Sequence, residues 1–505
     1  MADPLRESYD EVPYESSPVP EAHPEVLAVT ARLMGLHPPA VERCRVLELG
    51  CAAGGNLFPM ALALPEARFV GVDLSPRQVA DGQKVVDALG LSNLRLLAAD
   101  LRDLDASFGT FDYILCHGVF SWVPGAVREK VLSVCRENLA PCGVAFVSYN
   151  TYPGWHLRGL FRDLLSYGTR RSASPGERVE RARALLPFLA DAVGDPEGIY
   201  GRLLRHEAEL LSERPDAYVF HEHLEEVNQP LHVHDFIEMA GRHGLRFLGE
   251  ARLANVAEAE ATPRFRAALS RLADDPAERE QYLDYLLNRT FRRSLLVHEG
   301  ASRHARLSPD AIAELHVESD VAAAPGPGRF TTREGADCRI GDPALLRAME
   351  ILDAEAPGGL PFGELAARLG LPDGPGPFCR DVLALSMRSL VDLRTVPTKL
   401  QARVSATPRA YRLARLQALS GITQVTTPRH RTHDVGEFGR IVLARLDGTP
   451  HAQLTSTVAA EIGAGDFDLQ IDGRAVSEPA DIRTAVGEML PGLLQGLARA
   501  GLLDG

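Results

Sequence analysis

Short apolar runs alternate with amphipathic stretches along the chain between Arg45 and Ser148. This alternation is typical of parallel strands that are buried on both faces and joined by helices. The pattern predicts five strands, at Arg45–Leu49, Phe69–Val72, Leu94–Ala98, Tyr113–Cys116 and Gly143–Ser148. The first third of the chain is therefore expected to form an α/β domain.

A helical stretch then interrupts the α/β pattern. Residues 158–215 have leucines at helical spacing and Arg/Glu faces, with no strand-like run. The α/β pattern returns with an amphipathic helix at His234–His243, a glycine at position 244 and a short strand at Leu245–Glu250. We predict that residues 158–215 are an insertion in one domain, residues 1–255, whose last strand is Leu245–Glu250.

The next part of the chain is expected to be a helical middle region, residues 256–325. A helical pattern covers Pro263–Glu299, and the Ala/Pro/Gly stretch Val321–Arg329 has the composition of a linker.

The remainder, residues 330–505, is predicted to be winged-helix-like. Three short helices and a strand follow one another in the order of a winged helix, at Leu345–Leu352, Phe362–Leu369, Phe378–Leu390 and Val391–Val396. Two further helices, Phe438–Leu446 and Asp481–Leu503, indicate a second unit. We place the boundary between the two units near residue 425.

Composition narrows the class of protein. The chain has 505 residues, of which 45% are hydrophobic and 24% charged, as expected of a folded protein with several domains. Residues 1–25 carry acids and prolines, and no stretch approaches the roughly 18 apolar residues of a membrane helix. The seven cysteines form no C-x-x-C pair. These features predict a cytoplasmic protein without membrane insertion.

The net charge of −14 disfavours nucleic acid as a partner. One segment, Arg394–Arg431, has eight basic residues and no acids, but residues 331–505 as a whole hold 19 basic and 21 acidic side chains. The basic segment is therefore expected to dock onto acids of another domain.

The segment from Val46 to Asn56 reads as a strand, a turn of small residues and a helix. It does not fit the G-x-G-x-x-G pattern of dinucleotide sites, because Ala52 stands where the second glycine is required. It resembles instead the E-x-G-x-x-x-G motif I of class I S-adenosylmethionine-dependent methyltransferases, with Glu48 before the turn. An acid there suits a cationic ligand and would repel a pyrophosphate.

The resemblance implies a seven-stranded Rossmann-like methyltransferase fold that binds S-adenosyl-L-methionine. Asp73 and Asp100 end the second and third predicted strands. In such enzymes these acids bind the ribose hydroxyls and the adenine amino group. The cofactor-binding residues implied are Tyr14, Glu48, Gly50, Cys51, Ala52, Gly54, Asn56, Asp73, Leu74, Asp100, Leu101, His117 and Gly118.

Aromatic residues gather in the loop after the fifth predicted strand, although only 6% of the chain is aromatic. The loop follows the carboxyl edge of the sheet, where open α/β sheets bind ligands. Aromatic rings there favour a cationic amine, although the same rings could simply cover the end of the sheet. As catalytic residues we predict Tyr149, Asn150, Tyr152 and Trp155, and as substrate-binding residues Trp122 and His221.

Further segments make the resemblance more specific. They are residues 9–14, 117–124, 149–155, 221–228, 282–293 and 414–418, and they resemble bacterial methyltransferases with a regulatory domain, including protein lysine methyltransferases of outer-membrane proteins. The resemblance implies methylation of lysine nitrogen on a protein. Two alternatives are a small-molecule or peptide natural-product methyltransferase and a non-catalytic cofactor-binding regulatory protein. A homodimer is compatible with all three.

Four histidines, His221, His223, His232 and His234, lie close together in the sequence. Their spacing is not that of an H-E-x-x-H site, and methyl transfer from a sulfonium requires no metal. We therefore predict no metal and assign these histidines to the substrate side or to contacts between domains.

Overall fold

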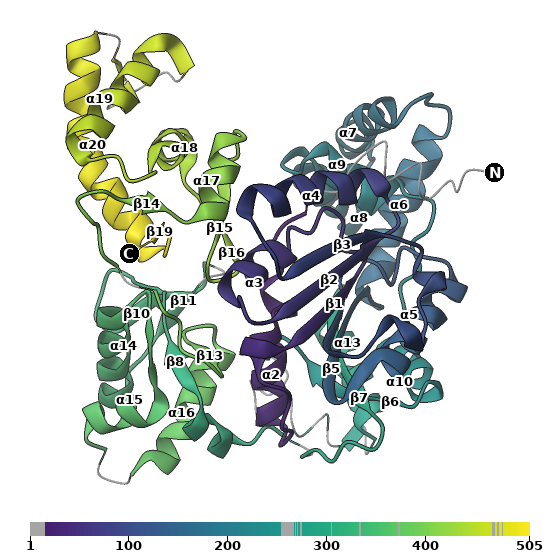
Figure 1. Ribbon diagram of the computed structural model, residues 1–505. Helices are drawn as coiled ribbons and strands as arrows, with labels where there is room; N and C mark the ends of the chain where they lie inside the picture. The colour runs from purple at the N-terminus through teal and green to yellow at the C-terminus, as the bar shows by residue number, and fades with distance from the viewer. Residues whose placement is uncertain are drawn as a thin grey trace.

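The computed structural model describes residues 16–504 except 254–266, 268, 270, 273–274, 305, 333–334, 372–373, 401, 467–469, 472–473 and 477. A seven-stranded sheet in the order β3-β2-β1-β4-β5-β7-β6 dominates the first part of the chain (Figure 1). Its strands are β1 (Arg45–Leu49), β2 (Arg68–Asp73), β3 (Leu94–Ala98), β4 (Phe111–Cys116), β5 (Leu139–Asn150), β6 (Leu245–Glu250) and β7 (Phe291–His298).

The first five strands pair in parallel, and their positions confirm the strands predicted from the sequence. Parallel pairing brings their carboxyl ends, and the loops that follow them, to one edge of the sheet. β6 lies in the same sheet, as predicted.

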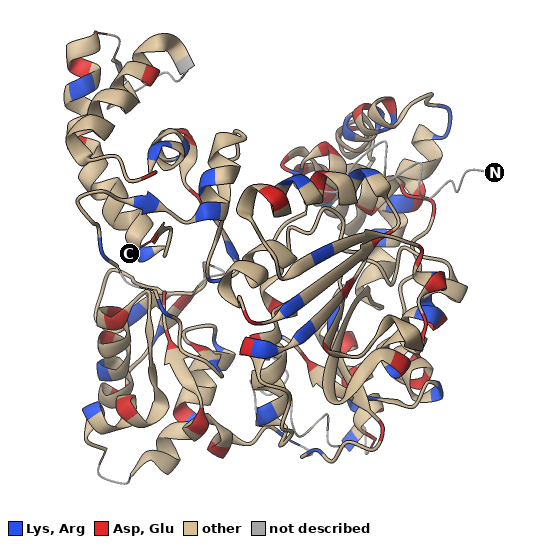
Figure 2. Ribbon diagram, viewed as in Figure 1, with Lys and Arg blue, Asp and Glu red and all other residues tan. Residues whose placement is uncertain are grey.

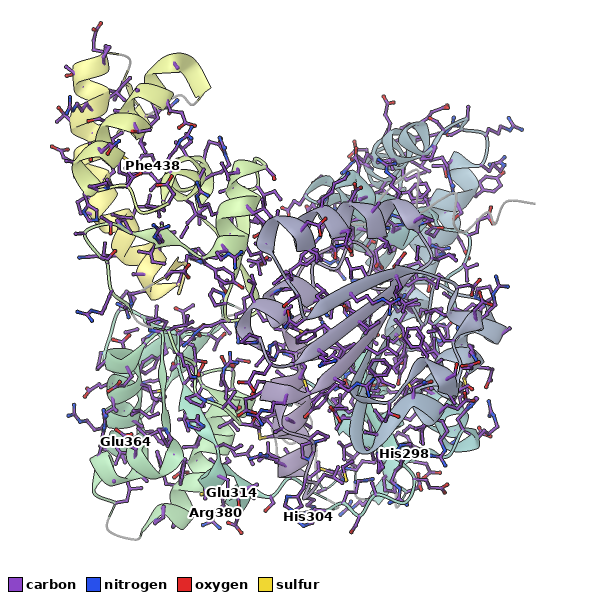
Figure 3. All side chains as sticks on the ribbon, in the orientation of Figure 1. His298, His304, Glu314, Glu364, Arg380 and Phe438 are labelled. Atoms are coloured by element: carbon purple, nitrogen blue, oxygen red, sulfur yellow. The ribbon has the colours of Figure 1, made fainter. Side chains whose placement is uncertain are left out.

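The prediction that Leu245–Glu250 is the last strand of the sheet is wrong. The later strand β7 lies between β5 and β6 and pairs with both in antiparallel fashion. His298, labelled in Figure 3, ends β7, and its Nε2 donates a hydrogen bond to the carbonyl of Leu139 at the start of β5. The sheet therefore extends beyond the domain limit predicted at residue 255, and the segment Pro263–Glu299 is not helical throughout.

Helices lie on both faces of the sheet (Figure 1). They are α2 (Pro24–Leu33), α3 (Leu57–Ala63), α4 (Pro76–Leu89), α5 (Gly125–Asn138), α10 (Val233–Arg242) and α13 (Pro276–Leu287). Short helical turns accompany them at η1 (Pro20–Ala22), η2 (Val41–Arg43), η3 (Leu101–Asp103) and η4 (Ala106–Phe108). α4 begins close to the carboxyl edge, since β2 ends at Asp73 and α4 starts at Pro76. Ser75 caps the helix by accepting a hydrogen bond from the Gln78 backbone amide.

The stretch between β5 and α10 is helical, as predicted. It comprises α6 (Gly154–Thr169), α7 (Pro175–Ala192), α8 (Ile199–Ser212), α9 (Asp216–Val219) and the π-helical turn η5 (Phe220–Leu224). These helices share a small apolar core of their own, which includes Phe161, Leu186 and Leu204. They therefore form a compact insertion beside the carboxyl edge of the sheet.

A middle unit follows β7. It contains η6 (Pro309–Glu314), β8 (His316–Glu318), β9 (Ala322–Ala323), β10 (Arg329–Thr331), β11 (Asp337–Arg339), α14 (Pro343–Glu355), β12 (Gly359–Pro361), α15 (Phe362–Leu369), α16 (Pro375–Met387) and β13 (Asp392–Arg394). The three helices and the strand predicted here are confirmed. The expected linker Val321–Arg329 is wrong, because its ends belong to β9 and β10, which pair in a small sheet with β11.

The C-terminal unit consists of β14 (Arg409–Ala410), α17 (Arg412–Leu419), β15 (Gln424–Thr427), β16 (Arg431–Asp434), α18 (Gly436–Arg445), α19 (His451–Glu461), η7 (Ile462–Asp466), β17 (Gln470–Ile471), β18 (Arg474–Ala475), α20 (Pro479–Arg499) and β19 (Leu503–Asp504). β14 pairs with β19 at the end of the chain. The second unit therefore begins before residue 425, the position at which we predicted the boundary between the two units.

Acidic and basic residues are interspersed over the C-terminal units (Figure 2). Two arginines at the end of the basic segment Arg394–Arg431 contact acids of the middle unit: Arg429 pairs with Asp320 and Arg431 with Asp392, both at 2.9 Å. The expectation that this segment docks onto another domain is confirmed for these two residues.

Candidate functional site

The turn after β1 brings the backbone close to its surroundings at the carboxyl edge of the sheet. Gly50 and Gly54 have φ of 75° and 87°, and Ala52 has φ of 49°. A Cβ on Gly50 would lie 2.3 Å from Cγ2 of Val119, so any side chain there would force the neighbouring loop to shift. Glycine is required at this position for both its conformation and its space.

Glu48 lies beneath this turn, in β1, and only 3% of it is exposed. Its Oε1 accepts a 2.7 Å hydrogen bond from Nδ2 of Asn56, and its Oε2 has no hydrogen-bond partner in the described part of the chain. Burial raises the pKa of Glu48 to about 8, the Asn56 bond opposes this, and the charge of Asp73 raises it further. A buried carboxyl with one unpartnered oxygen fits a cationic ligand group.

Asp73 ends β2 and braces the turn after β1. Its Oδ2 accepts a 2.7 Å hydrogen bond from the Ala52 amide, and its Oδ1 accepts a 2.9 Å bond from the Ser75 amide. The carboxylate is thereby held between the turn and the start of α4. Leu74, next in the chain, is half-buried.

Asp100 follows β3 and caps η3. Its side chain pairs with Arg102 at 2.6 Å and also accepts a bond from the Arg102 amide. The hydrogen bond from the Arg102 side chain lowers the pKa of Asp100, so this carboxylate is ionised. Leu101 beside it is buried.

The loop after β4 contributes His117 and Gly118. Oγ of Ser148 lies 3.1 Å from Nδ1 of His117 and accepts a 2.9 Å bond from the Gly118 amide. Gly118 has φ of 65°, and a Cβ there would meet open space. Burial, followed by the charge of Arg293, lowers the pKa of His117 to about 4, so the ring is neutral at pH 7. The predicted residue Tyr14 lies outside the described residues.

The two tryptophans of the chain pack against each other. The rings of Trp122, in the loop after β4, and Trp155, in α6, are 6.2 Å apart in an edge-to-face arrangement. Arg158 lies over the Trp155 ring and Arg162 over the Trp122 ring, at 5.8 and 5.9 Å. Both rings are buried and already have a cation beside them.

Tyr152 belongs to a different aromatic group. Its ring stacks on His156 at 4.2 Å and lies 5.2 Å from the ring of His232. His232 in turn lies 6.1 Å from Tyr285, of which 52% is exposed. This group therefore leads from the loop after β5 to the surface near α13.

The structure does not join the predicted aromatic wall into one cluster. Tyr149 is 1% exposed and stacks on Phe236 of α10 at 4.3 Å, in the core. Successive residues of a strand face opposite sides of the sheet, so Tyr149 points away from the face of Ser148 and Asn150. Asn150 instead contacts the loop after β4: its backbone amide donates a hydrogen bond to Oγ of Ser121 at 2.8 Å. Because the Tyr149 ring is buried in the core, it does not face an acceptor, and the prediction for this residue is corrected.

The four neighbouring histidines divide between a buried and an exposed group. His221 is buried, with Nδ1 3.1 Å from Oε1 of Glu225. His223 is also buried, whereas His232 is half-buried and His234 exposed. Among the described residues, no three His, Cys, Asp or Glu side chains are arranged to hold a metal ion.

One buried ion cluster was missed by the sequence reasoning. Arg292 of β7 is 0% exposed and pairs with Asp284 at 2.7 Å and with Glu250 at 2.9 Å. Oγ of Ser294 donates to the same Glu250 and lies 3.1 Å from the Tyr149 hydroxyl. The cluster therefore supports β5 where the aromatic loop begins. The only sequence signal is two arginines inside an apolar run.

Three family profiles match the chain. A methyltransferase domain matches residues 46–143, a predicted methyltransferase regulatory domain matches residues 215–298, and the C-terminal winged helix domain of PKMT (protein lysine methyltransferase) matches residues 407–502. An uncharacterized protein of Rickettsia prowazekii is 39% identical over 241 residues, which are 48% of this chain and 96% of that protein. The chain belongs to this family of methyltransferases with a regulatory domain.

Other relatives extend the comparison. A second uncharacterized protein of Rickettsia prowazekii is 40% identical over 309 residues, which are 61% of this chain but only 56% of that protein. The structure of PKMT2 from Rickettsia typhi in complex with AdoHcy superposes with a TM-score of 0.85 at 26% identity. The match covers 98% of this chain and 100% of that one, so the family member shares the order and arrangement of all three units.

None of the helices within the described ranges is both long and apolar enough to serve as a membrane span.

Proposed function

We propose that this protein transfers a methyl group from S-adenosylmethionine to the side-chain amine of lysine on an acceptor protein. The observation that carries the proposal is the buried carboxyl of Glu48, with one unpartnered oxygen, beneath a glycine turn at the carboxyl edge of the sheet. The bound AdoHcy of PKMT2 from Rickettsia typhi, the demethylated form of this cofactor, and the PKMT winged helix match support the choice of cofactor and acceptor.

The residues of the edge suit the parts of this cofactor. Glu48 would hold the α-ammonium group, because an ionised carboxylate with a cation beside it is stabilised against protonation. Asp73 would accept from the ribose hydroxyls, since its carboxylate is already oriented by the turn. Asp100 would accept a hydrogen bond from the adenine amino group, and this bond would replace one of its bonds with the Arg102 side chain.

When bound, S-adenosylmethionine supplies a methyl group on an electrophilic sulfonium. The acceptor ammonium would first lose a proton to water; the neutral nitrogen would then bond to the methyl carbon as the carbon–sulfur bond breaks, which leaves a methylated ammonium and S-adenosylhomocysteine. The protein therefore has to align a neutral amine and exclude water. His117, with a pKa of about 4, is too weak a base to deprotonate a lysine. We assign it to the wall of the pocket.

Tyr152 is the aromatic residue best placed to receive the lysine side chain. Its ring is half-buried, and through the His232 ring it is connected to the exposed Tyr285. Aromatic faces attract an ammonium group, and partial desolvation then favours its neutral form. Trp155, packed under Trp122 and Arg158, would act as the support of this loop.

The test combines binding with turnover. The protein is incubated with isotope-labelled S-adenosylmethionine and a bacterial proteome, and mass spectrometry locates the label. Label on lysine supports the proposal; label on small molecules or natural-product peptides alone supports the alternative enzyme. Cofactor binding in calorimetry without any turnover supports the regulatory protein. Absence of cofactor binding would reject all three.

A cytoplasmic location and a homodimer are the remaining parts of the proposal. The first rests on the seven cysteines of the sequence, which form no C-x-x-C pair. The second is tested by sedimentation of the purified protein.

A further inference from the structure

A hairpin of the C-terminal unit reaches the turn after β1. β15 and β16 lie between the C-terminal helices and α3, which follows that turn (Figure 1). The tip of the hairpin carries His430, whose φ is 60° and whose side chain is buried. Residues more than 370 positions apart in the sequence thus meet beneath the proposed cofactor site.

Three buried side chains form a chain of hydrogen bonds at this contact. Nε2 of His430 lies 2.8 Å from Oδ1 of Asn56, and Nδ2 of Asn56 donates to Oε1 of Glu48 at 2.7 Å. The three side chains are buried, with 3%, 4% and 3% exposure in the same order. The backbone amide of Val19 donates to Oδ1 of Asn56 as well, at 2.8 Å.

The amide of Val19 fixes the direction of every bond in the chain. A backbone N–H can only donate, so the Asn56 atom that it faces must be the carbonyl oxygen. The other Asn56 atom is then the amide nitrogen, which donates to Glu48. His430 must in turn donate from Nε2, and its proton is therefore on Nε2.

The surroundings keep the His430 ring neutral and in place. Burial and the positive charge of Arg394 lower the pKa of His430 to about 3, against a smaller opposing effect of the Val19 backbone. Its Nδ1 has no hydrogen-bond partner in the described ranges, and the ring packs edge-on against His23 at 5.0 Å. His430 also borders a cleft of about 270 Å³ between α2, β13 and the hairpin.

Other residues of the hairpin contact the middle unit. Arg429 and Arg431 on either side of His430 pair with Asp320 and Asp392 of the middle unit. The donor of His430 serves the methyltransferase side of the contact instead, because it points at Asn56 of the turn.

We propose that His430 is a positioning residue for the cofactor: its Nε2 proton fixes the Asn56 amide, which holds Oε1 of Glu48 and leaves Oε2 for the ligand. The inference rests on the proposed function, since it assigns Glu48 to the cofactor. It makes cofactor affinity depend on the winged helix unit. Without the donor, Oδ1 of Asn56 keeps only the Val19 amide as a partner, and the Asn56 amide holds Glu48 less firmly.

Two variants separate the hydrogen bond from the shape of the ring. His430→Phe keeps the ring without a donor, whereas His430→Gln keeps a donating amide at a similar reach. We expect His430→Phe to weaken binding of S-adenosylhomocysteine about tenfold in calorimetry, the size expected for a bond that orients a charged group. His430→Gln should stay within about threefold of the wild type. In turnover, the loss should appear in the cofactor KM rather than in kcat.

His433 provides the matched control. It lies on the same hairpin with an exposed side chain, so His433→Phe and His433→Gln should both bind like the wild type. The relay is tested by a cycle with Asn56→Ala: once Asn56 is removed, His430→Phe should cause no further loss.

Wild-type affinity in folded His430→Phe, or full additivity with Asn56→Ala, would overturn the inference. If His430→Phe does not fold, His430→Asn replaces it, because its amide stops short of Asn56; wild-type affinity there would overturn the inference equally. A wild-type protein that does not bind S-adenosylhomocysteine would reject the proposed function together with the inference. Intact wild-type binding with unimpaired His430 variants rejects the inference alone.

Discussion

Ligand binding should release a proton from Glu48. In the ligand-free protein its pKa of about 8 means that the carboxyl is nearly all protonated at pH 6.5. Relative to an ordinary glutamic acid, this pKa corresponds to a preference of roughly 5 kcal/mol for the neutral form in the folded protein. An ammonium group bound at Oε2 would reverse that preference and expel about one proton.

The assay is calorimetry of S-adenosylhomocysteine binding at pH 6.5 in two buffers with different ionisation enthalpies. The difference in heat gives the number of protons released, which we expect to be about one for the wild type and close to zero for Glu48→Gln. Glu66→Gln, an exposed carboxyl change, is the control. Equal proton release by the wild type and Glu48→Gln would refute the role of Glu48.

The same pKa predicts how stability changes with pH in the ligand-free protein. Because the folded-state pKa is raised, the stability that Glu48 contributes is fully present below its ordinary pKa and is lost as the pH rises through about 8. Chemical denaturation should therefore show Glu48→Gln gaining stability over the wild type between pH 6 and pH 9. A constant difference over this range would contradict the raised pKa.

Four further experiments test other parts of the molecule. Asp73→Ala should weaken S-adenosylhomocysteine binding by about 2 kcal/mol or more, roughly thirtyfold, in calorimetry, while the exposed Asp87→Ala should not; equal affinities would reject the ribose assignment. Tyr152→Ala should lower the rate of methylation much more than cofactor affinity, and an unchanged rate would reduce the loop to a structural cover. Methylation of a lysine acceptor should rise with pH as the amine deprotonates, and a flat profile with chemistry limiting would argue for another acceptor. Arg292→Met should cost roughly 3 to 5 kcal/mol in denaturant unfolding, because it leaves buried carboxylates unpaired, whereas the exposed Arg347→Met should cost less than about 1 kcal/mol.

The first five strands could be predicted because each contains a short, mainly apolar run that is mostly buried, such as Tyr113–Cys116 in β4. β7 was missed for a physical reason: Arg292 and Arg293 stand inside it, and a charge is tolerated there only because Asp284 and Glu250 neutralise it. Such pairing depends on tertiary structure and leaves no local pattern. The small strands β9 and β10 were missed likewise, since Ala/Pro/Gly composition dominates that stretch.

The cofactor edge was more predictable than the acceptor side. Glu48, Asp73 and Asp100 are placed by the ends of parallel strands, which the sequence locates well. We predicted that the aromatic residues of the loop form one wall. Successive strand residues face opposite sides of the sheet, however, and this separates Tyr149 from its neighbours. His430 had no local signal, because its contact with Asn56 joins residues that are 374 positions apart in the sequence.

The place of β7 in the sheet affects how the protein can be synthesised and divided. β6 pairs with β7, and β7 is what joins it to β5. While a nascent chain is still shorter than about residue 298, β5 therefore presents an open apolar edge and β6 has no partner in the sheet. A fragment ending at residue 255 would keep both defects permanently and would be expected to aggregate during expression. The region matched by the regulatory profile, residues 215–298, supplies both strands, so it cannot be removed from the catalytic fold as a detachable module.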